Sequence, residues 1–175
     1  MKKALIAVAA LAALSSSAFA ATPTGNPGTI NFIGEIVAGA CGISADTLDQ
    51  TVSLGQVPAG EFAKAGDRSQ TPAPFNIVLT DCNIATAKNA FFTFTGTSDV
   101  DVPGLFAVTG GAGNVGIRLQ TASGEYLDNG AEQKSTVVLS NGNNTVRFAA
   151  MYEATQATVT PGVADSVANF TVRYQ

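Results

Sequence analysis

The sequence predicts an all-β fold of the sandwich type, and three observations lead to this prediction. Val, Thr, Phe, Gly and Asn are abundant, while charged residues make up only 13% of the chain, a composition that favours sheet over helix. Short runs alternate apolar and polar side chains, as strands with one buried face do. Turns rich in Gly and Asn, such as 110–113 and 141–144, separate these runs. Short strands at this spacing are typical of a β-sandwich.

The first twenty residues have the features of a secretory signal peptide. Lys2 and Lys3 precede an apolar run at 4–14, and small residues suited to cleavage follow at 18–20. The run is too short to span a membrane, so we expect export and removal of residues 1–20. Without the two lysines, the 9 basic residues become 7 against 13 acidic ones, a net charge of −6. This balance gives no basic surface for nucleic acid or anionic lipid.

The mature chain is expected to begin with a flexible segment and a loose strand. Residues 21–28 are small and polar and contain two prolines. Residues 29–37 then alternate, which places four side chains on one face of an extended strand. These are Ile30, Phe32, Gly34 and Ile36.

The central part of the chain reads as short strands in a single domain, with no internal repeat and no linker. Alternating or apolar runs predict strands at 51–57, 75–82, 90–96, 105–109, 115–120, 136–139 and 145–154. A helical turn is expected within 62–70, kept short by Gly60 and Gly66.

The final strand is expected at 169–175, where Phe170, Val172 and Tyr174 share one face. Because the alternation continues to Gln175, no later strand is expected to cover the edge of this one. An uncovered edge exposes unpaired backbone groups and templates pairing with another chain.

The two cysteines, Cys41 and Cys82, are expected to form a disulfide because the chain is predicted to be exported. The alternative is a pair of free or metal-binding thiols. The chain has no histidine, and the two cysteines lack CxxC spacing, so the disulfide is the better interpretation.

No motif indicates catalysis or a cofactor. Gly111, Gly113 and Gly116 spell GxGxxG, but 117–120 reads as strand, whereas a dinucleotide site needs a helix there. Asp99 and Asp101 lack the other ligands of a calcium loop. Without histidine, neither a Ser-His-Asp nor a Cys-His arrangement is available. A pair of carboxylates meeting in space stays open, although nothing in their placement favours it. We expect no enzyme, no metal and no cofactor.

Several motifs together resemble one family. They are the segments 28–37, 49–57 and 75–82, a glycine fourteenth from the C-terminus at Gly162, and the penultimate Tyr174. With these features the chain resembles the chaperone–usher pilins, specifically the major subunit family of type 1 fimbriae. The resemblance covers the whole mature chain.

This resemblance implies an immunoglobulin-like β-sandwich that lacks its final strand (the pilin fold) and is completed by a donor strand from a neighbouring subunit. The domains would be a signal peptide at 1–20, an N-terminal extension with the donor strand at 21–37, and the incomplete sandwich at 38–175. Ile30, Phe32 and Ile36 would enter apolar pockets of the neighbouring subunit, while Gly34 would lie where the groove of that neighbour is tight.

The resemblance also implies partners and a location. The expected partners are identical subunits in a homopolymer, a periplasmic chaperone, an outer-membrane usher and minor or tip pilins. The chaperone would hold the C-terminal strand through Phe170, Val172 and Tyr174. The product would pass through the periplasm to the cell surface as a fimbria that supports adhesion. The alternatives are a one-domain tip adaptor of the same system and a self-contained secreted binding domain, with a secreted enzyme further behind.

Overall fold

The structure is a computed structural model that describes residues 28–175. It divides into two units, one ending at Glu35 and one comprising Ile36–Gln175. In the first unit, residues 28–35 are exposed and form neither helix nor strand. The predicted signal peptide, 1–20, lies outside the described residues, as does 21–27.

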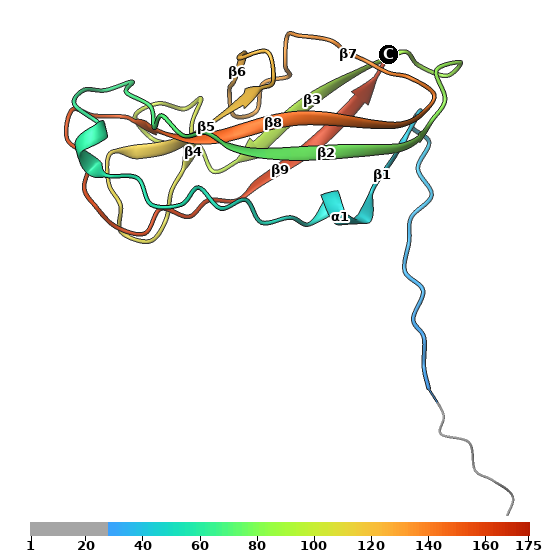
Figure 1. Cartoon of the computed structure of the whole chain (residues 1–175), viewed down its shortest axis with the longest axis horizontal. Coiled ribbons are helices and arrows are strands. Elements are labelled where there is room, and N and C mark those ends of the chain that lie inside the picture. Colours follow the sequence, from blue (N-terminus) through green and yellow to red (C-terminus); the bar gives the residue numbers. More distant parts are fainter. Residues whose placement is uncertain (1–27) are drawn as a thin grey trace, which may run out of the picture. The chain divides into compact units, whose positions relative to one another are not determined.

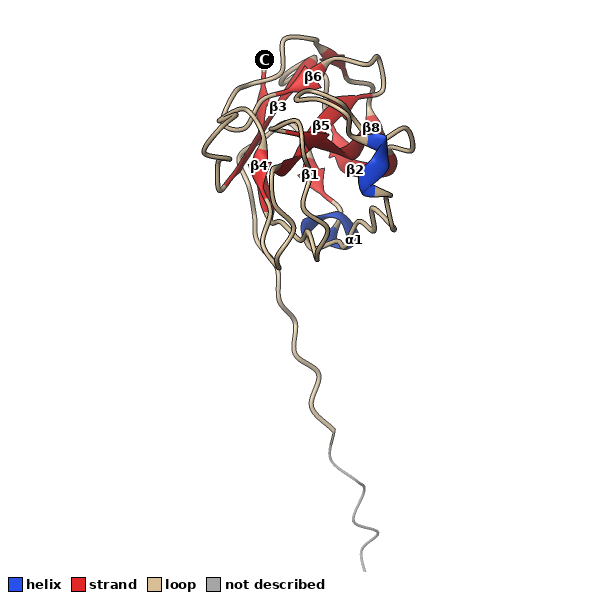
Figure 2. Ribbon diagram, turned by 90° about the vertical axis from the view of Figure 1, so that its left-hand side faces the viewer, coloured by secondary structure: helices blue, strands red, loops and turns tan. Residues whose placement is uncertain are grey.

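The second unit is built from two antiparallel sheets (Figure 1). The larger sheet has the order β1-β2-β8-β5-β4, and a short strand β6 also pairs with β5. Its strands are β1 (Gly42–Ile43), β2 (Ala73–Cys82), β4 (Phe106–Ala107), β5 (Val115–Thr121), β6 (Tyr126–Leu127) and β8 (Gly142–Ala154). The smaller sheet has the order β7-β3-β9, formed by β7 (Val137–Val138), β3 (Asn89–Gly96) and β9 (Ala168–Tyr174). Two short helices, α1 (Ala45–Leu48) and η1 (Ala59–Glu61), connect strands rather than build the core (Figure 2). The all-β prediction is therefore confirmed.

Aromatic side chains join the two sheets. Phe148 of β8 lies 5.1 Å from Phe92 and 5.0 Å from Phe94 of β3, measured between ring centroids, and both contacts are edge-to-face. Phe92 is fully buried, and Phe94 and Phe148 nearly so. These residues occupy alternate positions on their strands, so the period-2 pattern of the sequence places them on the inner faces.

The strands predicted at 75–82, 90–96, 105–109, 115–120, 136–139, 145–154 and 169–175 are confirmed, with some bounds shifted. The helical turn predicted at 62–70 is wrong: the short helix η1 lies just before it. In the loop that follows, the Asp67 carboxylate accepts hydrogen bonds from the N–H groups of Ala63 and Lys64, at 2.8 and 2.9 Å. These bonds, with Gly66 at a φ of 86°, hold a turn in place of a helix.

Two further strand predictions are wrong for the chain by itself. Neither 29–37 nor 51–57 is a strand in the structure, although both sequences alternate. A strand is defined by its hydrogen-bonded partner, and neither segment has one among the described residues. In residues 28–175, no helix is long and apolar enough to cross a membrane.

Candidate functional site: the open edge of the sandwich

The C-terminal strand β9 is paired on one side only. It runs antiparallel to β3 over its whole length, from Ala168 opposite Gly96 to Tyr174 opposite Ala90. Beyond it, Gln175 and Asn89 exchange two backbone hydrogen bonds, at 2.9 and 2.8 Å. Within the part of the chain that the structure describes, no strand pairs with the other side of β9.

The antiparallel pairing of β9 with β3 determines which residues of β9 turn their backbone N–H and C=O groups toward the unpaired side. Because Gln175 exchanges hydrogen bonds with β3, every second residue before it does the same, and the residues between turn their N–H and C=O groups away. We call this second set the open edge. It consists of Ala168, Phe170, Val172 and Tyr174.

Three of the four side chains of the open edge point toward the core but are not fully covered, while Ala168 is exposed. Phe170, Val172 and Tyr174 pack against the buried core cluster, yet each is only half-buried. Phe170 lies 6.2 Å from Phe94, ring to ring, and Phe94 in turn lies 6.2 Å from Phe75 of β2. A row of aromatic rings therefore runs from β9 across the sandwich to β2 and is incompletely covered at β9. Core residues left partly exposed beside unpaired backbone are the mark of a missing strand.

A second segment without a backbone partner follows helix α1. Residues 51–57, which we call the border segment, take part in no backbone–backbone hydrogen bond among residues 28–175. Val52 and Leu54 are nevertheless half-buried between exposed neighbours, as in a strand, and Val57 is half-buried as well. The segment parts from β2, leaving a hollow of about 630 Å³ lined by residues of 46–55 and 71–78. The alternation that predicted a strand here is thus real, but the hydrogen-bonding partner is missing.

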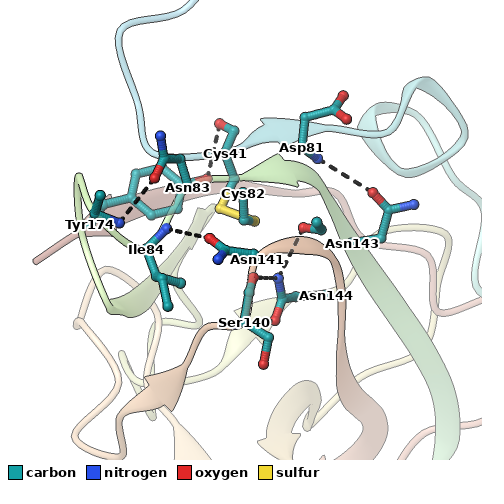
Figure 3. The surroundings of a disulfide bond; sticks show 12 residues. Cys41, Asp81, Cys82, Asn83, Ile84, Ser140, Asn141, Asn143, Asn144 and Tyr174 are labelled. Carbon is teal, nitrogen blue, oxygen red and sulfur yellow. Dashed lines mark hydrogen bonds between the residues drawn. A yellow bond between two sulfur atoms is a disulfide. The ribbon is translucent and has the colours of Figure 1, made fainter.

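The end of the open edge is anchored beside the disulfide (Figure 3). Cys41 and Cys82 are bonded to each other and buried, which confirms the predicted pairing. The Tyr174 hydroxyl donates to the carbonyl oxygen of Cys41 at 3.5 Å. A Cβ atom on Gly39 would lie only 2.9 Å from the Tyr174 ring, so the backbone passes very close there. Burial raises the pKa of Tyr174. The disulfide thus joins β2 to the place where the chain enters the sandwich, next to the final strand.

Asparagine side chains brace the loops around the disulfide (Figure 3). Asn141 accepts from the N–H of Ile84 at 3.0 Å, and Asn143 accepts from the N–H of Asp81 at 3.3 Å. Asp81 has a φ of 52°, in the left-handed region that is uncommon for a residue other than glycine. These contacts hold the turn after β2 against the start of β8.

The predicted donor-strand residues are fully available for contact. Ile30, Phe32 and Ile36 are 78%, 91% and 101% exposed. Gly34 has no atom within 4 Å of where its Cβ would be, so the tight place predicted for it is not in the subunit itself. Large apolar side chains exposed at alternate positions are unusual and indicate a binding segment.

The sequence did not reveal a buried ionic cluster on the face of the larger sheet that points away from the core. Arg118 of β5 donates to both carboxylate oxygens of Glu153 of β8, at 3.0 and 3.2 Å, and to Asp128 at 2.6 Å. Arg68 also donates to Glu153, at 2.6 Å. Burial by itself would raise the pKa of Glu153, but the hydrogen bonds from the two arginines outweigh it and lower that pKa. Because every charge has a partner, the cluster reads as structural support.

The other motifs have structural roles. Gly111 and Gly113 lie in the turn before β5. Residues 117–120 belong to β5, so the prediction of a strand there, in place of a helix, is confirmed. The Asp99 carboxylate accepts from the N–H groups of Asp101 and Val102, both at 3.0 Å, and so closes a turn. Among residues 28–175, no group of three or more acidic or cysteine side chains is placed to hold a metal ion.

Comparison with known proteins gives one consistent family. The profile described as "Fimbrial protein" matches residues 30–175. The fimbrial subunit type 1 of Klebsiella pneumoniae is 42% identical over 98% of this chain and 97% of its own length. A chain from a chaperone–usher pilus has a TM-score of 0.72 at 29% identity, covering 89% of this chain and 99% of that one. The P pilus rod subunit PapA has a TM-score of 0.66 at 30% identity, covering 78% of this chain and all of that one.

Proposed function

The chain belongs to the fimbrial protein family, and from that premise we propose that residues 29–37 of one subunit complete the open edge of the next. It is a structural subunit of a chaperone–usher pilus, exported to the cell surface as part of an extracellular fimbria. Donor-strand exchange between identical copies is the proposed mechanism of polymerisation. We propose no catalytic role, because the family is one of structural fimbrial subunits.

One observation carries the proposal: the same chain has both a strand that is paired on one side only and an extended apolar segment that is unpaired among residues 28–175. The open edge of β9 presents backbone groups beside half-buried Phe170, Val172 and Tyr174. Residues 29–37 present exposed apolar side chains at every second position and pair with no strand among the residues that the structure describes. Strand addition uses these two features, since backbone hydrogen bonds supply affinity and alternate side chains supply specificity.

The remaining partners follow from the state of the subunit before assembly. A subunit with an uncovered edge is prone to unspecific strand pairing, so it needs a temporary occupant. We propose that a periplasmic chaperone contacts Phe170, Val172 and Tyr174, and that an outer-membrane usher exchanges it for the next subunit. Minor or tip pilins would end the fibre through the same edge.

Deletion of residues 21–37 tests the proposal. The full chain, expressed with a matching chaperone and usher, is expected to give a ladder in SDS that collapses to one band only on harsh heating or in acid. The truncated subunit should be recovered with the chaperone but give no ladder, because it cannot complete a neighbour. A ladder of truncated subunits would refute the assignment of the donor strand. Long rods formed without any other pilin would separate a rod subunit from a tip adaptor.

A further inference from the structure

We infer that Asn141 is a site of slow chemical modification, in which its side-chain amide leaves as ammonia and a carboxylate takes its place. The mature chain contains two Asn-Gly pairs, Asn129-Gly130 and Asn141-Gly142. An asparagine before glycine is open to this reaction because no side chain keeps the glycine nitrogen away from the amide carbon. The structure leaves one pair open and holds the other in place. The inference does not depend on the proposed donor-strand exchange.

The reaction consumes only water. The backbone nitrogen of the glycine attacks the side-chain carbonyl carbon of the asparagine, loses its proton and expels the amide nitrogen as ammonia, which closes a succinimide ring. Water then adds to one of the two carbonyl carbons of the ring and opens it. Opening at one carbonyl gives aspartate. Opening at the other gives isoaspartate, in which the main chain runs through the side-chain carbon.

The amide of Asn141 is open to attack. The residue is exposed at the bend before β8, close to the disulfide (Figure 3). Its side-chain oxygen accepts a hydrogen bond from the N–H of Ile84 at 3.0 Å. This donor polarises the carbonyl group and stabilises the negative charge that forms on the oxygen during attack, as the donors of an oxyanion hole do. The amide nitrogen, which must leave, has no hydrogen-bond partner among residues 28–175.

Gly142 has the freedom that ring closure requires. It is the first residue of β8, and the pairing of β8 with β2 is irregular between Leu79 and Cys82, next to Gly142. Its φ is 86°, and no atom lies within 4 Å of where its Cβ would be. Gly130 shares these last two features, with a φ of 79°, so the difference between the two pairs lies elsewhere.

The asparagine of the other pair is held by hydrogen bonds. Asn129 is half-buried, and its amide nitrogen donates to the carbonyl oxygen of Gly96 and to the Ser98 hydroxyl, both at 3.0 Å. The N–H of Gly130, which would have to attack, donates to the carbonyl oxygen of Phe94 at 2.7 Å. Each net hydrogen bond that must open slows a reaction about fivefold, so the two bonds of the amide nitrogen alone make this pair roughly thirtyfold slower.

The two products differ in their effect on the fold. A carboxylate at position 141 still accepts from the N–H of Ile84, so aspartate keeps the turn. Isoaspartate adds a carbon to the main chain directly before β8 and displaces Gly142 from its place opposite Cys82. Either product adds a negative charge at the surface beside the disulfide (Figure 3). An extracellular fibre therefore gains charge at this point as it ages.

Tryptic peptides separate the two pairs within one sample. Cleavage after lysine and arginine places Asn129 in the peptide 119–134 and Asn141 in the peptide 135–147. The mature chain, purified from the cell surface, is incubated at mildly alkaline pH, and the replacement of NH₂ by OH is followed by mass spectrometry. Fragment ions assign the change to one asparagine, and isoaspartyl methyltransferase counts the isoaspartate. We expect Asn141 to convert roughly thirtyfold faster than Asn129 in the folded chain.

Two variants and one condition serve as controls. Asn141→Gln keeps an amide, but its ring would be larger and closes poorly, so conversion at this position should cease. Ser98→Ala removes one bond from the amide of Asn129 and should speed conversion there about fivefold. In denaturant with the disulfide reduced, the two pairs should convert at nearly equal rates, because the contacts that distinguish them are gone.

Each outcome decides the inference. Faster conversion of Asn141 in the folded chain, together with nearly equal rates in denaturant, supports it. Equal rates in the folded chain, or faster conversion of Asn129, overturn it. A difference that persists unchanged in denaturant also overturns it, because the folded structure is then not the cause. Donor-strand exchange stands in every case, since none of these measurements depends on it.

Discussion

Replacing Phe32 by alanine should weaken the fibre and leave the subunit unchanged. Phe32 is 91% exposed in the subunit, so its ring contributes almost nothing to folding there. In the proposed polymer the ring enters the neighbouring sandwich at the open edge of β9. The neighbouring Ile33 is 97% exposed and lies on the opposite face of the same extended segment, which makes Ile33→Ala the matched control.

The expected magnitude follows from the difference in burial. Truncation of a buried Phe to Ala costs about 3–5 kcal/mol, whereas surface substitutions usually stay within about 0.5 kcal/mol. A loss of about 3 kcal/mol at one subunit junction corresponds to roughly a hundredfold weaker association. The free energy of unfolding of the isolated subunit should differ from wild type by no more than a surface substitution does.

Two measurements decide the outcome. The first is the guanidinium concentration at which purified fibres lose the SDS-resistant ladder, compared among wild type, Phe32→Ala and Ile33→Ala. The second is the unfolding midpoint of the refolded monomers by circular dichroism. We expect a clear drop in fibre resistance for Phe32→Ala alone and equal monomer midpoints. Equal losses for the two variants would refute the assignment of faces, and a destabilised Phe32→Ala monomer would show that the ring already packs within its own subunit.

Three further perturbations probe the sandwich itself. Glu153→Gln leaves the buried Arg118 without its main partner and should cost about 3–5 kcal/mol in urea unfolding, whereas Glu132→Gln, in an exposed pair, should change little. Because the folded pKa of Glu153 is lowered, this carboxylate stabilises the fold above the ordinary carboxyl pKa, and the stabilisation is lost as the pH falls through the folded pKa. Glu153→Gln should therefore flatten the acidic part of the plot of unfolding free energy against pH. The same pH dependence in the variant as in the wild type would contradict this prediction. Cys41→Ser opens a disulfide that spans 41 residues and should cost about 4 kcal/mol, so equal midpoints for oxidised wild type and variant would exclude a stabilising role.

The fold was predictable where both partners of a contact lie in one chain. Strands β2, β3, β8 and β9 show clear alternation, and their inner faces carry the core phenylalanines. The position of β9 was also predictable, because residues 169–175 alternate clearly between apolar and polar side chains. The failures have a different origin. Residues 29–37 and 51–57 alternate equally well but form no strand in the subunit, since alternation shows which face is apolar and not whether a backbone partner exists.

The ionic cluster shows a second limit of the sequence. Arg118 lies between two apolar residues of β5 and reads as a side chain directed to solvent. It is only 7% exposed and forms ion pairs with Glu153 and Asp128. The three residues lie on β5, at the end of β8 and just after β6, so only the folded topology brings them together. Candidate residues on the open edge were found because they follow a local pattern, whereas this cluster follows none.

Two segments without a backbone partner bear on how the proposed donor strand would hold a fibre together. A strand added to the edge of a sheet ordinarily gains hydrogen bonds on one side only. Among residues 28–175, the open edge of β9 and the border segment 51–57 both lack backbone partners, and side chains from both pack against one core. A donor that paired with both segments would be ordered once, at about 1–2 kcal/mol per residue, and would gain ladder hydrogen bonds on two sides. Its removal would then expose core on both sides in one costly step, so we expect slow dissociation to hold the proposed fibre together.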